Sequence, residues 1–74
     1  MDVNEAKSAH EDELLAAPGV VGVGVGNEGG EDVIFVFVEE LTPANDAPEK
    51  LGLPARVEDF WLVMREIGSV KALG

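Results

Sequence analysis

The chain has 74 residues, of which fifteen are acidic and five are basic, giving a net charge of −10, and it contains no cysteine. The lack of cysteine excludes disulfides, thiolate metal sites and a cysteine nucleophile. The negative charge argues against nucleic acid and anionic membranes as partners, since both attract clustered lysine and arginine. We expect one small α+β domain, residues 1–74, whose marginal core would gain from self-association.

Two further properties of the sequence bear on location. No hydrophobic run approaches the roughly 20 residues of a membrane span, and the first residues lack the basic and apolar parts of a signal peptide. We therefore expect a cytoplasmic protein. The acidic excess also fits a halophilic source, because concentrated salt screens the repulsion between carboxylates.

The first predicted element is a helix from about Asn4 to Ala17. Apolar or small residues recur there at spacings of three and four, which places them on one face of a helix. Pro18-Gly19 ends it, because proline cannot continue the hydrogen-bond ladder and glycine accepts left-handed backbone angles. The predicted buried face consists of Val3, Ala6, His10, Leu14 and Ala17.

A strand of alternating valine and glycine follows, over Val20–Gly26. Its side chains point alternately to the two faces, with Val21, Val23 and Val25 on one. The other face carries only glycine, which offers nothing to pack. We expect another backbone, a helix or a ligand to lie directly on that bare face. The glycines predicted to pack closely are Gly22, Gly24 and Gly26.

Residues 27–32 are polar, contain two glycines and predict a hairpin connection. The next segment, Val33–Val38, is apolar on both faces and rich in β-branched and aromatic residues. This composition is typical of a central strand. Residues 39–54 are irregular, and we expect at least one helical turn there, because sixteen residues without one would be long for a connection in a small domain.

The pattern of residues 57–67 fits either a helix face or a strand. The Gly68-Ser69 pair favours strands, since such a pair joins the two strands of a hairpin. We therefore expect a third strand within Ala55–Glu66 and a fourth at Ser69–Leu73. The complete prediction is an α+β fold with an N-terminal helix packed on a mostly antiparallel sheet of about four strands.

Four segments follow one another along the chain: Pro18-Gly19-Val20-Val21-Gly22-Val23-Gly24-Val25-Gly26, the apolar run ending in Val38-Glu39-Glu40, Gly52-Leu53-Pro54, and Gly68-Ser69-Val70-Lys71-Ala72-Leu73. Together they resemble a short module that precedes the catalytic domain in some bacterial and plant trypsin-like proteins. The resemblance covers about Leu14 to Leu73 and implies an α-β-β-β-β module. The chain stops where a protease domain would begin, so we expect it to inherit no catalytic triad. It also departs from the module by about ten extra residues, Glu58 to Ile67, which bear on the pairing of the last two strands.

Candidate chemical sites are weak. A phosphate cradle at Gly22–Gly26 would need a basic residue, but Glu28, Glu31 and Asp32 follow it. His10 and Glu13 have the spacing of a metal-ligand pair, yet there is only one histidine. The acidic loop lacks the spacing of a calcium hand, and Ser8 and Ser69 lie in a predicted helix start and turn. We expect no enzyme activity, no cofactor and no metal.

A cluster of bulky apolar residues around Trp61 is the predicted interface. A sheet of four strands also leaves two edge strands with unpaired backbone groups. Residues 70–73, in the predicted last strand, contain only one charged residue that could protect such an edge. We therefore expect a noncatalytic interaction module that forms a homo-oligomer, with a dimer favoured. The alternative is a small-molecule or cation-binding domain that uses the glycine-faced strand or the acidic loop. The predicted interface residues are Phe60, Trp61, Met64, Val70 and Ala72.

Overall fold

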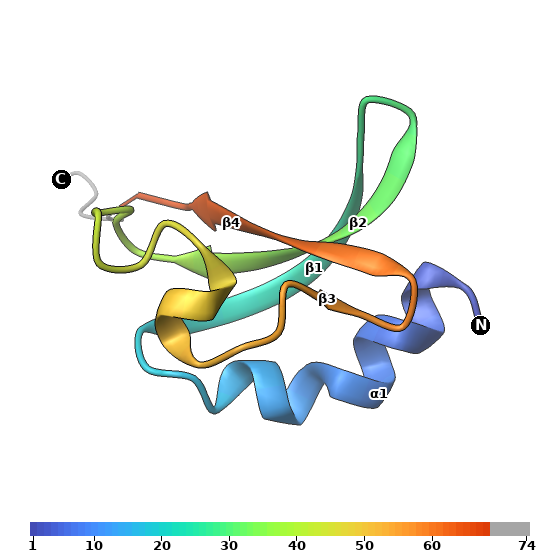
Figure 1. The fold of residues 1–74 in the computed structure, drawn as a ribbon, viewed down its shortest axis with the longest axis horizontal. Helices are drawn as coiled ribbons and strands as arrows, with labels where there is room; N and C mark the ends of the chain where they lie inside the picture. The colour runs from blue at the N-terminus through green and yellow to red at the C-terminus, as the bar shows by residue number, and fades with distance from the viewer. Residues whose placement is uncertain (69–74) are drawn as a thin grey trace, which may run out of the picture.

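A computed structural model describes residues 1–68. The elements are α1 (Val3–Leu15), β1 (Val20–Glu28), β2 (Glu31–Val38), the 3-10 turn η1 (Pro48–Leu51), β3 (Arg56–Val57) and β4 (Phe60–Glu66). The four strands lie in the order β1-β2-β4-β3, with α1 along one side of the sheet (Figure 1). β1–β2 and β3–β4 are antiparallel, whereas β2–β4 is parallel. The predicted α+β fold, with a helix on a mostly antiparallel sheet, is confirmed.

Helix α1 begins at a capping box. Asp2 accepts a 2.8 Å bond from the backbone N–H of Glu5, and the Glu5 carboxylate accepts a 3.1 Å bond from the N–H of Asp2. These bonds satisfy backbone donors that the first turn leaves without helical partners. The helix ends at Leu15, two residues before the predicted end, and Gly19 has a φ of 81° in the connection to β1.

The β1–β2 hairpin is tighter than the sequence predicted. Its turn consists of Gly29 and Gly30 alone, with φ values of 59° and 90°. Positive φ at both positions is typical of a type I′ turn, whose twist matches that of the strands. The strands therefore extend to Glu28 and from Glu31, and a bulge between Val20 and Gly22 interrupts the regular pairing.

Strand β2 lies between β1 and β4, as its composition predicted. Ile34, Val36 and Val38 are at most 1% exposed and pack in the core together with residues of α1. This side of the sheet is the helix side. The buried core cluster consists of Val3, Ala6, Leu14, Ile34, Val36, Val38, Leu53, Val57, Leu62 and Met64.

The strand prediction for residues 57–67 is confirmed, but the position of the hairpin differs. Two strands, β3 and β4, lie within the range predicted for one, and the turn between them consists of Glu58 and Asp59. Glu58 has a φ of 54°, which is uncommon for a residue with a side chain. The predicted fourth strand, Ser69–Leu73, lies outside the described residues.

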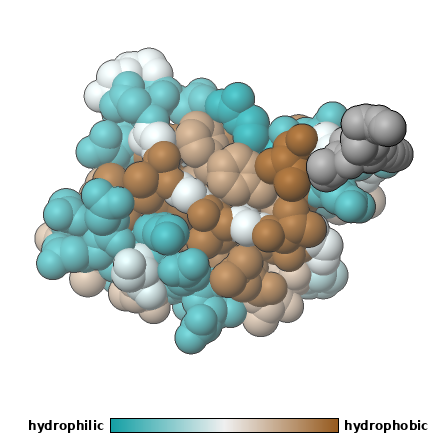
Figure 2. All heavy atoms as spheres, turned by 180° about the vertical axis from the view of Figure 1, so that it is seen from behind, coloured by the Kyte–Doolittle hydropathy of each residue, from teal (hydrophilic) through white to brown (hydrophobic). Residues whose placement is uncertain are grey.

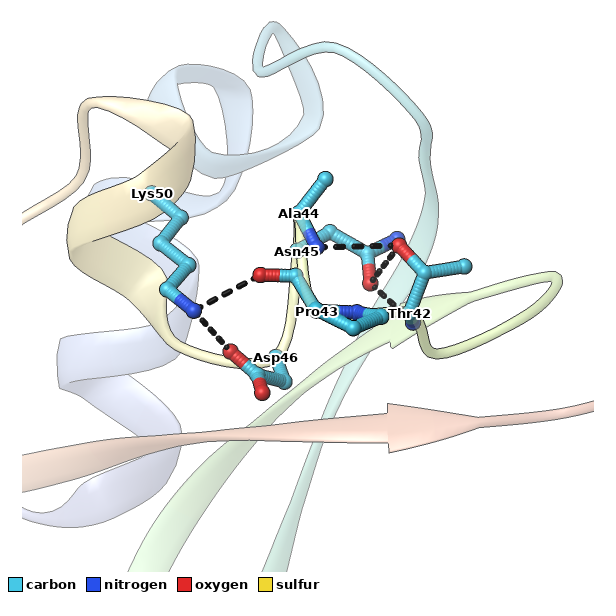
Figure 3. Close-up of polar contacts among 6 residues, drawn as sticks. All are labelled: Thr42, Pro43, Ala44, Asn45, Asp46 and Lys50. Carbon is cyan, nitrogen blue, oxygen red and sulfur yellow. Dashed lines mark hydrogen bonds and ion pairs between the residues drawn. The ribbon is translucent and has the colours of Figure 1, made fainter.

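The connection between β2 and β3 contains the expected helical turn, η1, which ends at Gly52 with a φ of 78°. A network of polar contacts holds the segment before it (Figure 3). Lys50 Nζ donates to the carbonyl of Pro43 at 2.7 Å and lies 2.8 Å from Asp46 Oδ1. The bond from Lys50 lowers the pKa of Asp46. Thr42 and Asn45 close the same segment through a 2.8 Å bond from the Thr42 N–H to Asn45 Oδ1.

Within residues 1–68, no helix is both long enough and apolar enough to cross a membrane.

Candidate interaction surface

The side of the sheet that faces away from α1 carries aromatic rings over glycines. Phe35 and Phe37 alternate along β2 with the buried residues of the helix side, and their ring centroids lie 6.0 Å apart. A Cβ added at Gly24 would lie 3.1 Å from Cε2 of Phe37, and one added at Gly26 would overlap the Phe35 ring. The expectation of a backbone, a helix or a ligand on this face is therefore wrong. Rings from the neighbouring strand cover the glycines, a known way of stabilising glycine in a sheet.

Arg65 connects this outer face from β4 to β1. Its guanidinium carbon lies 4.7 Å from the centroid of the Phe35 ring, and its Nη2 donates to Glu28 Oε2 at 2.7 Å. The guanidinium therefore stacks on an aromatic ring and pairs with a carboxylate at the same time. Because Glu28 lies at the end of β1, this contact holds the tip of the β1–β2 hairpin to the other half of the sheet.

The predicted interface residues do not form one exposed cluster. Trp61 is 48% exposed and lies under the guanidinium of Arg56, whose carbon is 5.2 Å from the ring centroid. Met64 is only 8% exposed and belongs to the core, so its assignment to an interface is wrong; alternation along β4 turns it to the helix side with Leu62. Phe60 is partly buried against the core. Val70 and Ala72 lie outside the described residues.

Strand β1 forms one edge of the described sheet, with β2 as its neighbour on one side. A two-residue turn is closed by a hydrogen-bonded pair, here Glu28 and Glu31. Pairs then alternate, so Gly26 and Gly24 bond to β2, whereas Val25 and Val23 direct their N–H and C=O groups away from the sheet. We call this outward row the β1 edge. The edge expected from the sequence at residues 70–73 lies outside the described residues.

The side chains around the β1 edge are mostly apolar. Val25 is 37% exposed, Val21 at the bulge is 51% exposed, and Leu15 at the end of α1 is 39% exposed. Seen from the side on which β1 lies, hydrophobic residues gather in the middle of the molecule, with near-neutral ones between them and hydrophilic ones around them (Figure 2). Patches of this kind on small soluble domains are typical of contact surfaces.

The only histidine lies on the opposite flank of α1. His10 Nδ1 is 3.0 Å from Glu13 Oε1, and Nε2 is 3.1 Å from Glu58 Oε2 in the β3–β4 turn. The hydrogen bond to Glu58, followed by that to Glu13, raises the pKa of His10. The pairing with Glu13 matches the spacing in the sequence, whereas Glu58 is 48 residues away and no local pattern links it to His10. Among residues 1–68, no group of three or more possible ligands is placed to hold a metal ion.

The acidic residues near the hairpin tip are separated rather than gathered. Glu28 pairs with Arg65, and Asp32 accepts a 3.3 Å bond from the side chain of Asn27. A hollow elsewhere on the surface has Glu39, Glu40 and Glu66 among the described residues that line it. The Glu66 carboxylate accepts a 2.8 Å bond from the N–H of Leu41. Three carboxylates at this hollow would repel an anionic ligand.

Comparison of the chain with protein-family models, with characterised proteins and with solved structures finds no match. The resemblance of Leu14–Leu73 to the module that precedes some trypsin-like domains therefore stays a prediction.

Proposed function

We propose that the protein is a noncatalytic interaction module that associates with itself. The observation that carries this proposal is the β1 edge. β1 has nine residues, its Val23 and Val25 direct backbone N–H and C=O groups outward, and the side chains of Val21 and Val25 are partly exposed. Unpaired edges of this kind readily pair with another strand, and proteins that remain monomeric usually protect them with lysine, proline or a covering segment. Val20–Gly26 contains none of these residues.

The small size of the domain supports the same function. A core in a domain of fewer than 80 residues rarely supplies more than about 3–5 kcal/mol of stability without additional links. The protein has no cysteine for a disulfide. Burial of Val21, Val25 and Leu15 against a second copy would add apolar area that the isolated domain leaves in water.

The arrangement of the chemically reactive side chains favours a noncatalytic role. His10 is the only histidine in the chain, and both of its ring nitrogens are engaged by carboxylates. Ser8 lies exposed on α1 and has no side-chain bond to His10 among the contacts within residues 1–68. A nucleophile activated by a general base requires such a bond.

Light scattering coupled to size-exclusion chromatography tests the proposed function. The purified chain is measured from about 5 to 500 μM, a range that brackets micromolar affinity, in low and high sodium chloride. We expect the mass to rise from that of the 7.8 kDa monomer towards twice that value. Salt should shift the rise to lower concentration, because each copy carries a charge of −10. A monomer mass throughout the series would overturn the proposal.

A further inference from the structure

We propose that two copies pair antiparallel along their β1 edges, centred on Gly24, so that the two sheets become one sheet of eight described strands. This inference rests on the self-association proposed above and assigns its site and geometry. It places the interface at β1 instead of at the predicted cluster around Trp61, which lies on β4.

The two edges of the described sheet differ in their capacity to pair. β1 has nine residues, whereas β3 has two and is preceded closely by Pro54. β3 is also followed by Glu58, whose left-handed φ of 54° turns the chain away. Two residues offer at most one pair of outward backbone bonds, so β3 is a poor template. β4 extends beyond β3 over residues 63–66, but this stretch is shorter than β1 and includes the charged Arg65 and Glu66. β1 is therefore the longer and less charged edge, on which a second strand gains the most bonds.

The register follows from the bulge and from the charges. The bulge disturbs regular pairing at Val21, and the first charged residue after it is Glu28. The regular, uncharged part that consists of valine and glycine is Gly22–Gly26, whose midpoint is Gly24. With Gly24 facing its own counterpart, Val23 of each copy lies opposite Val25 of the other. These are the residues that direct their N–H and C=O groups outward, so the backbone groups match.

Electrostatic repulsion selects the antiparallel direction. Each hairpin tip carries Glu28, Glu31 and Asp32, of which Glu28 is paired with Arg65. Parallel pairing would bring the two tips side by side, whereas antiparallel pairing puts them at opposite ends of the new sheet. A strand rises about 3.4 Å per residue, and neighbouring strands are about 4.8 Å apart. In the antiparallel pair, the two copies of Glu31 would therefore be roughly 30 Å apart. In a parallel pair with the tips aligned they would be about 14 Å apart.

The flank of α1 also fits a second copy. Glu13, on one side of the buried stripe, meets the β3–β4 turn through His10. The helical period turns Lys7 and Glu11 to the other side, towards β1, with which α1 makes its closest association. Lys7 Nζ lies 3.4 Å from Glu11 Oε1 within one copy. A two-fold axis at Gly24 would bring the Lys7–Glu11 pair of one copy opposite the same pair of the other copy. Each Lys7 could then also approach the carboxylate of Glu11 in the other copy.

Substitutions at Val25 test the site directly. Val25→Pro removes one outward N–H while leaving the bonds to β2 intact, because proline is tolerated where a strand donor points to solvent. Val25→Thr, which keeps both the donor and a β-branched shape, is the matched control. Trp61→Lys places a charge at the earlier predicted interface. We expect Val25→Pro to weaken dimerisation at least tenfold and the other two to change it less than threefold.

A folding defect is separated from an interface defect by a second substitution and by circular dichroism. Val25→Lys keeps every backbone donor and adds a charge at the pairing surface. It should also weaken dimerisation at least tenfold while the spectrum of the monomer stays that of the parent. A dimer that survives Val25→Pro and Val25→Lys but dissociates with Trp61→Lys would overturn the β1 assignment and leave self-association intact.

The distance between hairpin tips tests the direction. Because the chain has no cysteine, Glu31→Cys introduces a single site for a spin label. Electron–electron resonance of the labelled dimer should give a distance near 30 Å, about eight residues along the strands and three strand spacings across them. A distance below about 20 Å would indicate parallel pairing, and no dimer in any sample would overturn the proposed function itself. If the chain stays monomeric alone and its β1 edge binds an unrelated extended peptide, the proposal that a second copy pairs with this edge is contradicted.

Discussion

His10 and Glu58 are 48 residues apart in the chain, yet Nε2 of the histidine lies 3.1 Å from Oε2 of the glutamate. The other ring nitrogen lies 3.0 Å from Glu13 Oε1. A neutral imidazole has one N–H and donates only one of these bonds, whereas the imidazolium donates both. The contact that fixes the β3–β4 turn to α1 is therefore complete when His10 is protonated.

The first prediction concerns pH. The two hydrogen bonds raise the pKa of His10 above its ordinary value of 6.5, so folding favours the protonated ring. The stabilisation is fully present below the unfolded pKa and is lost as the pH rises through the folded pKa. We expect the thermal midpoint to fall as the pH is raised above the ordinary histidine pKa of about 6.5. The loss should be about 0.2–1 kcal/mol, because both carboxylates are partly exposed.

Two variants identify the group responsible for that change. His10→Gln should flatten the profile above about pH 6.5, while Lys7→Gln on the same helix should leave its slope unchanged. Glu58→Gln should reduce the slope in part, because Glu13 remains. A profile in which His10→Gln retains the full slope would show that other groups set the pH dependence.

The second prediction is a graded series of alanine substitutions along β1. An added Cβ would overlap the Phe35 ring at Gly26, lie 3.1 Å from the Phe37 ring at Gly24 and lie at an ordinary 3.8 Å from it at Gly22. Overpacking costs about 1–3 kcal/mol, so Gly26→Ala should lose about that much stability. Gly24→Ala should lose less, and Gly22→Ala should change stability by less than about 0.5 kcal/mol. Urea unfolding at one fixed protein concentration measures all three.

The rings themselves provide the control for this series. If the Phe35 ring causes the loss at Gly26, then Phe35→Leu should recover part of the stability of Gly26→Ala and none of that of Gly24→Ala. An equal loss for all three glycine variants would show that contact with the rings does not determine the effect.

The third prediction separates the two contacts of Arg65. Arg65→Lys keeps a charge for Glu28 but loses the planar group that stacks on Phe35. We expect a loss of about 0.5–1 kcal/mol at this half-exposed site. In a double-mutant cycle, Arg65→Lys and Phe35→Leu should couple more strongly than Arg65→Lys and Glu28→Gln. If the effects of Arg65→Lys and Phe35→Leu are additive, the stacking of Arg65 on Phe35 does not contribute to stability.

The fourth prediction concerns salt. A charge of −10 on 74 residues should destabilise the compact state by self-repulsion. The thermal midpoint should therefore rise between about 0.05 and 1 M sodium chloride, as screening shortens the Debye length. Glu40→Lys, which changes the net charge from −10 to −8, should show a smaller rise. A midpoint that falls with salt would mean that attractive ion pairs outweigh the repulsion.

The sequence predicted the elements whose residues carry local signals. The spacing of apolar residues, followed by Pro18-Gly19, marked α1, and the β-branched and aromatic run marked β2 as central. The paired glycines marked the β1–β2 turn, although its length was overestimated because Asn27 and Asp32 are common in turns as well as at strand ends.

The remaining features depend on contacts between distant segments. The Glu58-Asp59 turn contains no glycine or asparagine, so the sequence pattern did not mark it, and the turn was placed at Gly68-Ser69 instead. The parallel pairing of β2 with β4 follows from how the connection of residues 39–55 crosses the sheet. For the candidate surface, alternation predicted the glycine face, but only the register with β2 shows that Phe35 and Phe37 cover it.

The unequal length of the two sheet edges has a consequence for growth of the assembly. Strand-by-strand addition that uses two different edges is open-ended and gives filaments, whereas contact of one edge with itself closes at two subunits. Here β1 has nine residues, whereas β3, at the other edge of each copy, has two. A third copy would therefore find at β3 a template of only two residues. The short β3 therefore limits polymerisation, which offsets the aggregation risk of a long, uncharged edge strand.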